Sequence, residues 1–512
     1  MATLARQRHS HHAETKKEAF WRREGMGEPL LYHSTNNRNG KVNFETALMN
    51  GAPKDYGLYT IARPDIPKLA KEQIKEMRTM DYAGVATTVL TPYLRHEIAP
   101  KNIEKLVKKA YDSSVISAGM QRISGHSYIL WLTGGPTYSF KDYAGRFYGE
   151  VLEHFLTLRG ERKIIPIATS GDTGPALAHS LRNRPNVDVI IFFPRDSISN
   201  EQRRQMTTLY GNVYAFEVNG DFSLCQELVK YLLKNKEFAR DAFGNQDIFT
   251  SANSISIGRL LPQAIYPFYA YSRMMGDKDE PFVASIPSGN FGDMMGTIIA
   301  KEMGLPVERI ICALNENRVF ADFLATGRYE VRASVMSPST AMVVRHPSNL
   351  ARLVDFYGGH MYDEIDPATE KAVREGMIGR MPDMTAMKED IIAISVRNEE
   401  HYKAMREAYL RTGTLLDPHG AVGYWALKEY LSHCPDTLSV IYETAMPGKF
   451  PLEVQKGAGI VPITPKDMRE QATMAERIYP LEAEPRMTEK GMRLSDAQIV
   501  EATDMIRALN LR

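Results

Sequence analysis

From Lys163 onward, short apolar runs rich in β-branched residues alternate with amphipathic segments. Such runs have the length of buried strands, and the amphipathic segments have the spacing of helices that cover a sheet. The alternation is typical of a parallel sheet with helices on its faces, so it predicts an α/β, doubly wound fold. The predicted strands are Ile164–Ala168, Val187–Phe193, Val213–Val218, Phe282–Ile286, Ile310–Leu314 and Leu438–Tyr442.

Apolar residues at helical spacing predict the helices that surround these strands. Four stripes stand out: Leu224, Leu228, Tyr231 and Leu232; Leu260, Leu261, Ile265 and Phe268; Ile103, Leu106, Val107 and Ala110; and Ile499, Ala502, Ile506 and Leu509. The third stripe, together with a helical pattern over Pro67–Met80, predicts a separate and largely helical region over the first 125 or so residues. The fourth predicts a docked helix at the end of the chain.

Charge and cysteine content narrow the range of functions that this chain can have. Lysine and arginine total 63 against 62 acidic residues, a formal net charge of +1, so no overall field attracts a nucleic acid and any anion must be held locally. The three cysteines, Cys225, Cys312 and Cys434, are far apart, which excludes a disulfide framework and a thiolate zinc cluster. We expect a reducing, cytoplasmic location.

Neither a membrane anchor nor a metal site is expected. No apolar run approaches the roughly 20 residues that a membrane-spanning helix needs, and the first 28 residues lack the apolar core of a secretory signal. The histidine tract at residues 9–12 is typical of a solvated terminus.

A glycine-rich loop follows the strand predicted over Phe282–Ile286. Its residues Gly289, Asn290, Phe291, Gly292 and Asp293 precede a helical pattern over Met294–Met303. Glycines let backbone amides point at an anion, and a helix N-terminus adds partial positive charge, so the functional interpretation is a phosphate cradle. The structural alternative is an ordinary strand-to-helix turn, because the loop is neither a dinucleotide fingerprint nor a P-loop.

A second loop of the same kind, Thr169–Gly174, follows Ile164–Ala168 and opens a helix over Ala176–Leu181. Hydroxyl and amide groups at one helix N-terminus suit a carboxylate or a phosphate. Simple helix capping by Ser170, Asp172 or Thr173 is the alternative, because these residue types are favoured at any helix N-terminus.

A third loop contains Lys141, in the segment GGPTYSFKD that precedes a helix with the stripe Ala144, Phe147, Val151 and Phe155. A lysine beside an aromatic residue at such a turn can be partly desolvated, which lowers its pKa and makes the amine a nucleophile. Taken alone, a solvated lysine is the more common outcome.

Together, and in this order, these segments resemble the enzymes of fold type II that use pyridoxal 5′-phosphate (PLP), and among them the longer, fungal and enterobacterial-like branch of the threonine synthase family. The segments that carry the resemblance, over roughly residues 30–460, are GPTYSFKD, ATSGDTG, SISNEQRRQMTT, SGNFGD, DPHGAVG and ETAMPGKFP. The resemblance implies a tryptophan synthase β-like fold, with two doubly wound α/β lobes and a mostly helical N-terminal domain.

The resemblance also implies residues that hold the cofactor. Lys141 would form the internal aldimine with PLP and then transfer protons, and Thr444 would face the pyridine nitrogen. Asp172 would contact the 3′ oxygen of the cofactor. The cofactor phosphate would be enclosed by Gly289, Asn290, Phe291, Gly292 and Asp293.

A second set of residues would hold the substrate. Ser170 and Thr173 would bind its carboxylate. Asn253, Ser254 and Arg259 would bind its phosphate, a role that suits a guanidinium group because its fork can pair with two oxygens at once.

The implied reaction converts O-phosphohomoserine and water to threonine and phosphate, by γ-elimination followed by β-addition of water. Departures from the family pattern, such as Met446 for a histidine and Pro175 after the carboxylate loop, leave three alternatives open. These are a phospholyase that releases 2-oxobutanoate, a β- or γ-replacement enzyme on another phosphorylated amino acid, and a binding protein without catalysis, which the retained Lys141 disfavours. We expect a structural role for His419 of the DPHGAVG segment.

The domain division expected from the resemblance has five parts. These are a flexible leader (1–29), an N-terminal domain (30–125), a large PLP domain (126–165 and 271–478), a small domain (166–270) and a C-terminal extension (479–512). We expect a monomer or a homodimer.

Overall fold

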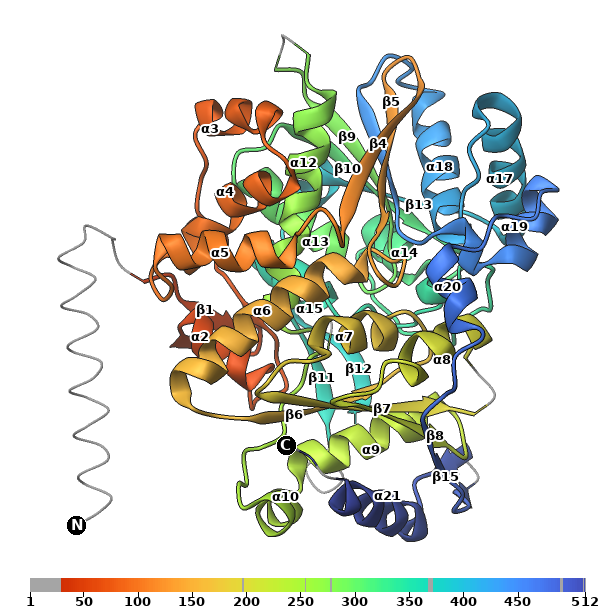
Figure 1. Ribbon diagram of the computed structural model, residues 1–512. Helices are drawn as coiled ribbons and strands as arrows, with labels where there is room; N and C mark the ends of the chain where they lie inside the picture. The colour runs from red at the N-terminus through yellow and green to blue at the C-terminus, as the bar shows by residue number, and fades with distance from the viewer. Residues whose placement is uncertain are drawn as a thin grey trace.

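Two sheets, one parallel and one mostly parallel, organise the computed structural model (Figure 1). The structure describes residues 29–195, 198–253, 255–276, 279–366, 372–488, 491–509 and 511. All six predicted strands are present in these two sheets, so the predicted α/β class is confirmed.

The larger sheet has six strands, in the order β13-β10-β9-β14-β5-β4. All neighbouring strands are parallel except the edge pair β4 and β5, which forms an antiparallel hairpin. The strands are β4 (Ser117–Ser124), β5 (Ser127–Gly134), β9 (Phe282–Pro287), β10 (Val307–Leu314), β13 (Ile391–Ser395) and β14 (Ser439–Glu443).

The central strands of this sheet are buried on both faces. On β9, Val283 packs into one hydrophobic cluster and Ala284 into another, and on β14 the same holds for Ile441 and Val440. Successive side chains of a strand point to opposite faces, so helices on both sides require a continuous apolar run. The surrounding helices are α13 (Gly292–Glu302), α14 (Val319–Thr326), α16 (Met384–Asp390), α17 (Asn398–Thr412) and α18 (Pro418–Leu431).

The smaller sheet is fully parallel, in the order β15-β8-β7-β6. Its strands are β6 (Lys163–Ala168), β7 (Val187–Pro194), β8 (Val213–Val218) and β15 (Ile478–Leu481). Its helices are α7 (Thr173–Leu181), α8 (Asn200–Thr207), α9 (Phe222–Lys234), α10 (Lys236–Phe243) and α21 (Asp496–Ala508). Leu224, Leu228 and Leu232 of α9 pack with Ala502 and Ile506 of α21 in one cluster, so both predicted helices are confirmed.

The region before β4 is largely helical, as predicted, but it also contains a small antiparallel sheet that was not predicted. The sheet has the order β2-β1-β3, from β1 (Tyr32–Ser34), β2 (Asn37–Val42) and β3 (Tyr59–Thr60). The helices are α2 (Phe44–Asn50), α3 (Lys71–Glu76), α4 (Tyr82–Leu94) and α5 (Pro100–Ala110). The helix predicted over Pro67–Met80 is shorter, because only α3 and a 3-10 turn over Met77–Thr79 form there.

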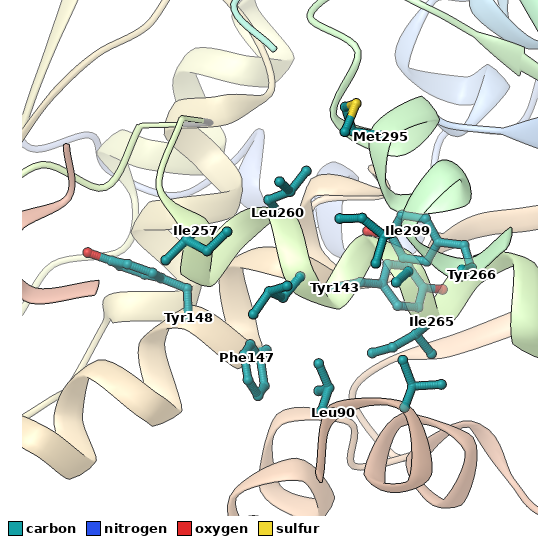
Figure 2. Packing of buried hydrophobic residues seen from close by; sticks show 14 of the residues in the cluster. Leu90, Tyr143, Phe147, Tyr148, Ile257, Leu260, Ile265, Tyr266, Met295 and Ile299 are labelled. Carbon is teal, nitrogen blue, oxygen red and sulfur yellow. The ribbon is translucent and has the colours of Figure 1, made fainter. Parts of the chain in front are cut away.

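The predicted helix with the stripe Leu260, Leu261, Ile265 and Phe268 is wrong as a single helix. The chain forms α11 (Ile257–Leu260), a 3-10 segment η3 (Leu261–Ala264) and α12 (Ile265–Met274). Pro262 lies in the 3-10 segment, and a proline lacks the N–H group that a continuous helix requires. The stripe is still buried, and Figure 2 shows side chains of these segments packed with Phe147 of α6 (Lys141–Arg159) and Ile299 of α13.

The remaining elements connect the two sheets or lie at the periphery. They are η1 (Arg63–Asp65), η4 (Thr340–Met342), η5 (Pro447–Lys449), α15 (Leu350–Phe356), α19 (Pro451–Ala458), α20 (Lys466–Gln471) and the antiparallel pairs β11 (His360–Ile365) with β12 (Ala372–Arg380) and β16 (Arg486–Thr488) with β17 (Gly491–Arg493). No helix of the described ranges is long and apolar enough to cross a membrane. The division into five domains stays a prediction.

Candidate active site

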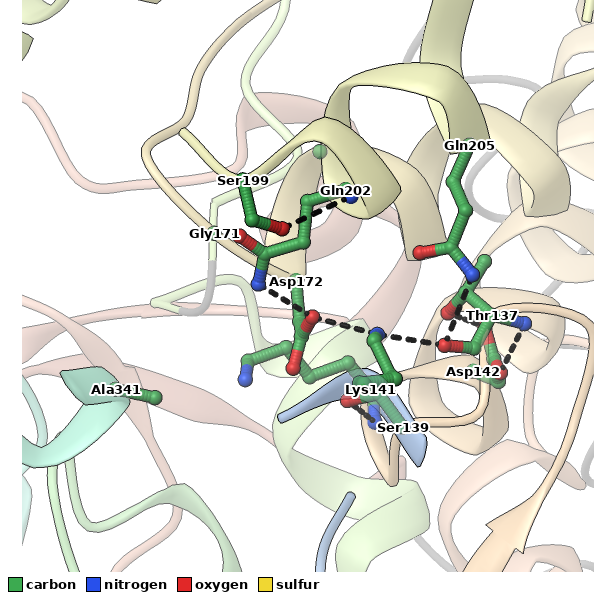
Figure 3. Close-up of polar contacts among 12 residues, drawn as sticks. Thr137, Ser139, Lys141, Asp142, Gly171, Asp172, Ser199, Gln202, Gln205 and Ala341 are labelled. Carbon is green, nitrogen blue, oxygen red and sulfur yellow. Dashed lines mark hydrogen bonds and ion pairs between the residues drawn. The ribbon is translucent and has the colours of Figure 1, made fainter. Parts of the chain in front are cut away.

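The loop that carries Lys141 connects β5 to α6 and is held by Asp142 in the first turn of the helix. The backbone N–H of Thr137 donates to Asp142 Oδ2 at 2.9 Å, and the Thr137 hydroxyl donates to Oδ1 at 2.6 Å (Figure 3). A Cβ atom on Gly135 would collide with the same carboxylate, so this position requires glycine. The backbone N–H of Phe140 donates to the Thr444 carbonyl at 2.9 Å, which ties the loop to the end of β14.

The Lys141 side chain lies in a desolvated environment. Burial lowers the pKa of the Lys141 amine below its ordinary value, and the charges of Lys449 and Arg259 act in the same direction, whereas those of Asp172 and Asp293 oppose it. The Nζ atom lies 4.9 Å from the centroid of the Phe140 ring. A lowered pKa increases the share of neutral amine, which is the nucleophilic form, so the direction of this shift favours the desolvated alternative for Lys141, whose residue as a whole is half-buried.

The glycine-rich loop after β9 is closely packed from two sides. A Cβ atom on Gly289 would lie 2.8 Å from the carbonyl oxygen of Ala341, and one on Gly292 would lie 2.8 Å from Gln263 Nε2. Phe291 has a left-handed backbone with φ of 60°, and its ring packs at 5.0 Å, between centroids, from Phe320 in the core. The loop therefore presents backbone rather than side chains, as a phosphate cradle requires.

Two side chains of this loop have different surroundings. Asn290 Oδ1 accepts hydrogen bonds from the backbone N–H of Ser348 at 3.3 Å and from its hydroxyl at 3.0 Å. Asp293 is buried in the first turn of α13, and burial raises its pKa to about 6 although the N–H of Met294 donates to it. Asp293 therefore gains a proton more readily than an exposed aspartate does.

The loop Thr169–Gly174 is closed by a threonine and not by an aspartate. Thr169 Oγ1 accepts from the N–H of Gly174 at 3.0 Å and from that of Gly171 at 3.2 Å. Asp172 occupies the N-cap position of α7, but its side chain makes no capping hydrogen bond, so the capping alternative is wrong for this residue. The side chain of Ser170 is exposed.

The Asp172 carboxylate is instead bound by residues from distant parts of the chain. Its Oδ1 atom accepts from Lys449 Nζ at 2.6 Å and from Gln202 Nε2 at 2.9 Å (Figure 3). Burial alone would raise the pKa of Asp172, but the charges of Lys449 and Lys141 together with these hydrogen bonds lower it well below its ordinary value. Asp172 is a stable anion in this environment.

Arg259 is a buried cation without an acidic partner among the described residues. Its Nη1 atom donates to the Ala252 carbonyl at 3.0 Å, and its buried Nε atom has no hydrogen-bond partner in the part of the chain that the structure describes. Burial lowers its pKa to about 10. Because an unpaired buried charge is costly, this guanidinium group is suited to an anionic ligand.

One cavity collects most of the residues that the sequence singled out: Lys141, Asp172, Thr173, Arg259, Gly289, Asn290, Gly292, Asp293 and Thr444. The Phe291 side chain points into the core, Ser170 is exposed, and Asn253 is half-buried and does not line the cavity. Ser254 lies outside the described residues. The cavity also contains Gln263, Ala341, Met342, Asn349 and His419, and of these only His419 stood out in the sequence, through its motif.

His419 is held by two neighbours at the wall of the cavity. Its Nδ1 atom lies 2.5 Å from Asp417 Oδ1, and its Nε2 atom accepts from the backbone N–H of Ala341 at 3.1 Å. The ring thereby fixes the Ala341 segment that packs over Gly289. Lys449 was not expected either, and its only sequence signal was its position in the segment ETAMPGKFP.

Two family models together match most of the chain. Residues 130–442 match the family described as Pyridoxal-phosphate dependent enzyme, and residues 31–111 match Threonine synthase N terminus. The threonine synthase of Pseudomonas aeruginosa is 33% identical over 458 residues, which cover 88% of this chain and 95% of the relative. The chain belongs to the threonine synthase family.

Solved structures of the threonine synthase family agree with this assignment. The PLP-bound threonine synthase from Brucella melitensis has a TM-score of 0.82 and 30% identity, over 94% of this chain and 99% of that one. The threonine synthase from yeast has a TM-score of 0.81 and 26% identity, over 94% and 99%. The expected family, fold type II and PLP cofactor are thereby confirmed.

Proposed function

We propose that this chain is a PLP-dependent threonine synthase, which converts O-phosphohomoserine and water to threonine and phosphate. The observation that carries the proposal is one cavity with a desolvated lysine, a glycine-rich cradle and a buried, unpaired guanidinium group. The substrate and the cofactor each bear a phosphate, so two separate anion sites beside one amine match this pair of molecules. The family membership supports the same reaction.

The residues present fit the cofactor. Gly289 and Gly292 have no room for a Cβ atom against Ala341 and Gln263, so the loop offers its backbone at the N-terminus of α13, which favours a phosphate group. Lys141 provides an amine in the same cavity, and Thr444, which has a neutral hydroxyl group, also lines this cavity. When bound, the cofactor supplies an electron sink that makes the protons at the α and β carbons of the substrate acidic.

Lys141 would act on these protons as the general base. Burial lowers the pKa of its amine, which raises the share of the neutral form that can take up a proton at Nζ and return it to another carbon. Arg259 would bind the substrate phosphate and orient it for departure from the γ carbon. We propose that Thr173 and the amides of its loop hold the substrate carboxylate, with Ser170 at the exposed rim.

Water has to enter only after the phosphate leaves. The loops of α7 and α8 come from the smaller sheet, whereas Lys141 and the glycine-rich loop come from the larger one. We propose that movement of the smaller sheet toward the larger one closes the cavity on the substrate, as in other enzymes that exclude water during chemistry.

The product assay tests this proposal against the phospholyase alternative. Purified holoenzyme incubated with O-phosphohomoserine should release equal amounts of threonine and phosphate. Release of 2-oxobutanoate and ammonia in place of threonine would identify a phospholyase. Borohydride reduction should fix the cofactor to a peptide containing Lys141, and fixation elsewhere would refute the role of this lysine.

We also propose a cytoplasmic monomer or homodimer that binds no nucleic acid. The net charge of +1 and the three separated cysteines support this proposal. Light scattering after size exclusion measures the oligomeric state, and a particle larger than a dimer would contradict it.

A further inference from the structure

Lys449 carries one of the most deeply buried charges of the described chain. Its side chain is 1% exposed, and its Nζ atom donates to Asp172 Oδ1 at 2.6 Å and to the Thr137 carbonyl at 2.7 Å. These partners lie 277 and 312 residues away in the sequence. A buried ion pair is weak evidence for stability, because desolvation of both charges offsets their attraction. Its position next to Lys141 suggests a role in the site.

The two partners of Lys449 belong to loops that follow different sheets. Thr137 lies in the loop after β5 of the larger sheet, four residues before Lys141, and Asp172 lies in the loop after β6 of the smaller sheet. Lys449 itself follows β14 of the larger sheet, so the ion pair joins segments that follow the two sheets. Gln205 of α8 also reaches the Thr137 carbonyl, at 3.4 Å.

The contacts of Asp172 leave one of its oxygens for the cavity. Its two donors among the described residues, Lys449 and Gln202, both bind Oδ1, and no described residue donates to Oδ2. The charged groups around this carboxylate are Lys449 and Lys141. Lys141 in turn interacts with Arg259 and Asp293, and Asp142, bonded to Thr137, lies within the field of Lys449.

We propose that Lys449 is a positioning residue of the active site, which acts through Asp172. Its ammonium group fixes the Asp172 carboxylate as a permanent anion with one oxygen toward Lys141, and it holds the Thr137 loop in register with the Asp172 loop. Without Lys449, the carboxylate loses its strongest partner in a buried site and takes up a proton. The negative charge beside the Lys141 nitrogen is then lost.

A direct effect of Lys449 on Lys141 would have the opposite sign. The negative charge of Asp172 favours a positive charge on the Lys141 nitrogen. Loss of the Asp172 charge therefore lowers the pH at which the Lys141 nitrogen loses its proton. Lys449 disfavours the same charge, so loss of Lys449 alone would raise that pH. The sign of the shift in a Lys449 variant therefore separates the two routes.

The test is an absorbance titration of the holoenzyme without substrate, because the visible band of the bound cofactor reports the protonation of the Lys141 nitrogen. We compare wild type, Lys449→Met, Asp172→Asn and the double variant, with Lys449→Arg as the conservative replacement. We expect Lys449→Met to move the transition to lower pH, as Asp172→Asn does, and the double variant to match Asp172→Asn. Lys449→Arg should lie closer to wild type.

Either of two shifts would overturn the proposal: a shift to higher pH in Lys449→Met, or a full additional shift when Lys449→Met is combined with Asp172→Asn. An unchanged transition in Lys449→Met would also contradict the proposal, because the ion pair of Lys449 would then have only a structural role. If Lys449→Met does not fold, the double variant, which has no lone buried charge, still gives the comparison with Asp172→Asn.

The proposal rests on the role of Lys141 proposed above, but the titration contains no substrate. A failed product assay with a normal titration would therefore refute the reaction and not Lys449. With substrate, we expect kcat/KM of Lys449→Met at pH 7 to fall on the order of 100-fold, as expected for a displaced catalytic group. An unchanged kcat/KM would also contradict the proposal.

Discussion

Replacement of Arg259 by methionine should stabilise the protein in the absence of substrate. Burial lowers the pKa of the guanidinium group from 12.5 to about 10, and at about 1.4 kcal/mol per pKa unit this corresponds to about 3 kcal/mol. The lost hydrogen bond to the Ala252 carbonyl costs about 1 kcal/mol. Methionine is unbranched and fills much of the same volume, so we expect the free energy of unfolding to rise by about 2 kcal/mol.

The same replacement should remove most of the activity. Loss of one partner of a buried, hydrogen-bonded charge pair costs about 2–5 kcal/mol, which corresponds to a decrease in kcat/KM of roughly 30- to 5,000-fold. The cofactor should still bind, because the variant retains Lys141 and the glycine-rich loop. Its absorbance titration should move to higher pH, because the Arg259 charge lowers the pKa of Lys141. Such opposite effects on stability and activity are expected at a site that binds an anion through an unpaired cation.

Urea unfolding and steady-state kinetics at one pH test both parts, with Arg184→Met as the matched control. Arg184 is also largely buried, but its Nη2 atom is paired with Glu150 at 3.0 Å and its Nε atom donates to the Ser180 carbonyl at 2.7 Å. The control should lose stability and keep its kcat/KM. If Arg259→Met loses stability as well, the guanidinium charge is already satisfied in the free protein and the reasoning is refuted.

Two further predictions concern the cofactor loop. Gly289→Ala should weaken cofactor binding at least about 10-fold in a spectrophotometric titration, because the added Cβ would press on the Ala341 carbonyl. The control is Gly125→Ala, whose Cβ meets no atom within 4 Å, and it should leave cofactor binding unchanged. The raised pKa of Asp293, about 6 against 3.8, means that the folded state holds this proton more tightly. Stability is therefore lost as pH rises from about 4 through 6, by about 3 kcal/mol. Asp293→Asn should abolish this loss in urea unfolding of the cofactor-free protein, and an equal loss in the variant would contradict the assignment.

Much of the fold could be predicted because it depends on local patterns. A strand buried on both faces needs a mostly apolar run, and such a run marked each of the six predicted strands, although single polar residues such as Asp188, Glu217 and Ser285 interrupt some of them. The apolar stripes that predicted α6, α9 and α21 likewise depend only on residues a few positions apart in the sequence. The break between α11 and α12 was missed, because the apolar stripe continues across Pro262 while the backbone cannot. The short strands β1 to β3 were missed because few residues carry their pattern.

The candidate site was predictable to the extent that its residues lie in the loops after strands. Asp172 and the glycine-rich loop each follow a predicted strand, and the carboxyl ends of parallel strands bring such loops together. Lys141 follows β5, which was not predicted, and it was identified through its segment GPTYSFKD. The partners of these residues were not predictable. Nothing near Asp172 in the sequence indicates that Lys449 and Gln202 bind it, and capping was an equally good explanation for its position.

By itself, the sequence determined the α/β class, the positions of the three loops and the resemblance to the threonine synthase family, because residue order and short-range periodicity carry this information. Only the tertiary structure decided the charge of each group. Burial lowers the pKa of Lys141, and Arg259 is buried without an acidic partner among the described residues. Burial alone would raise the pKa of Asp172, but pairing with Lys449 keeps this carboxylate an anion. Desolvation and pairing depend on residues hundreds of positions apart, which the linear chain does not bring together.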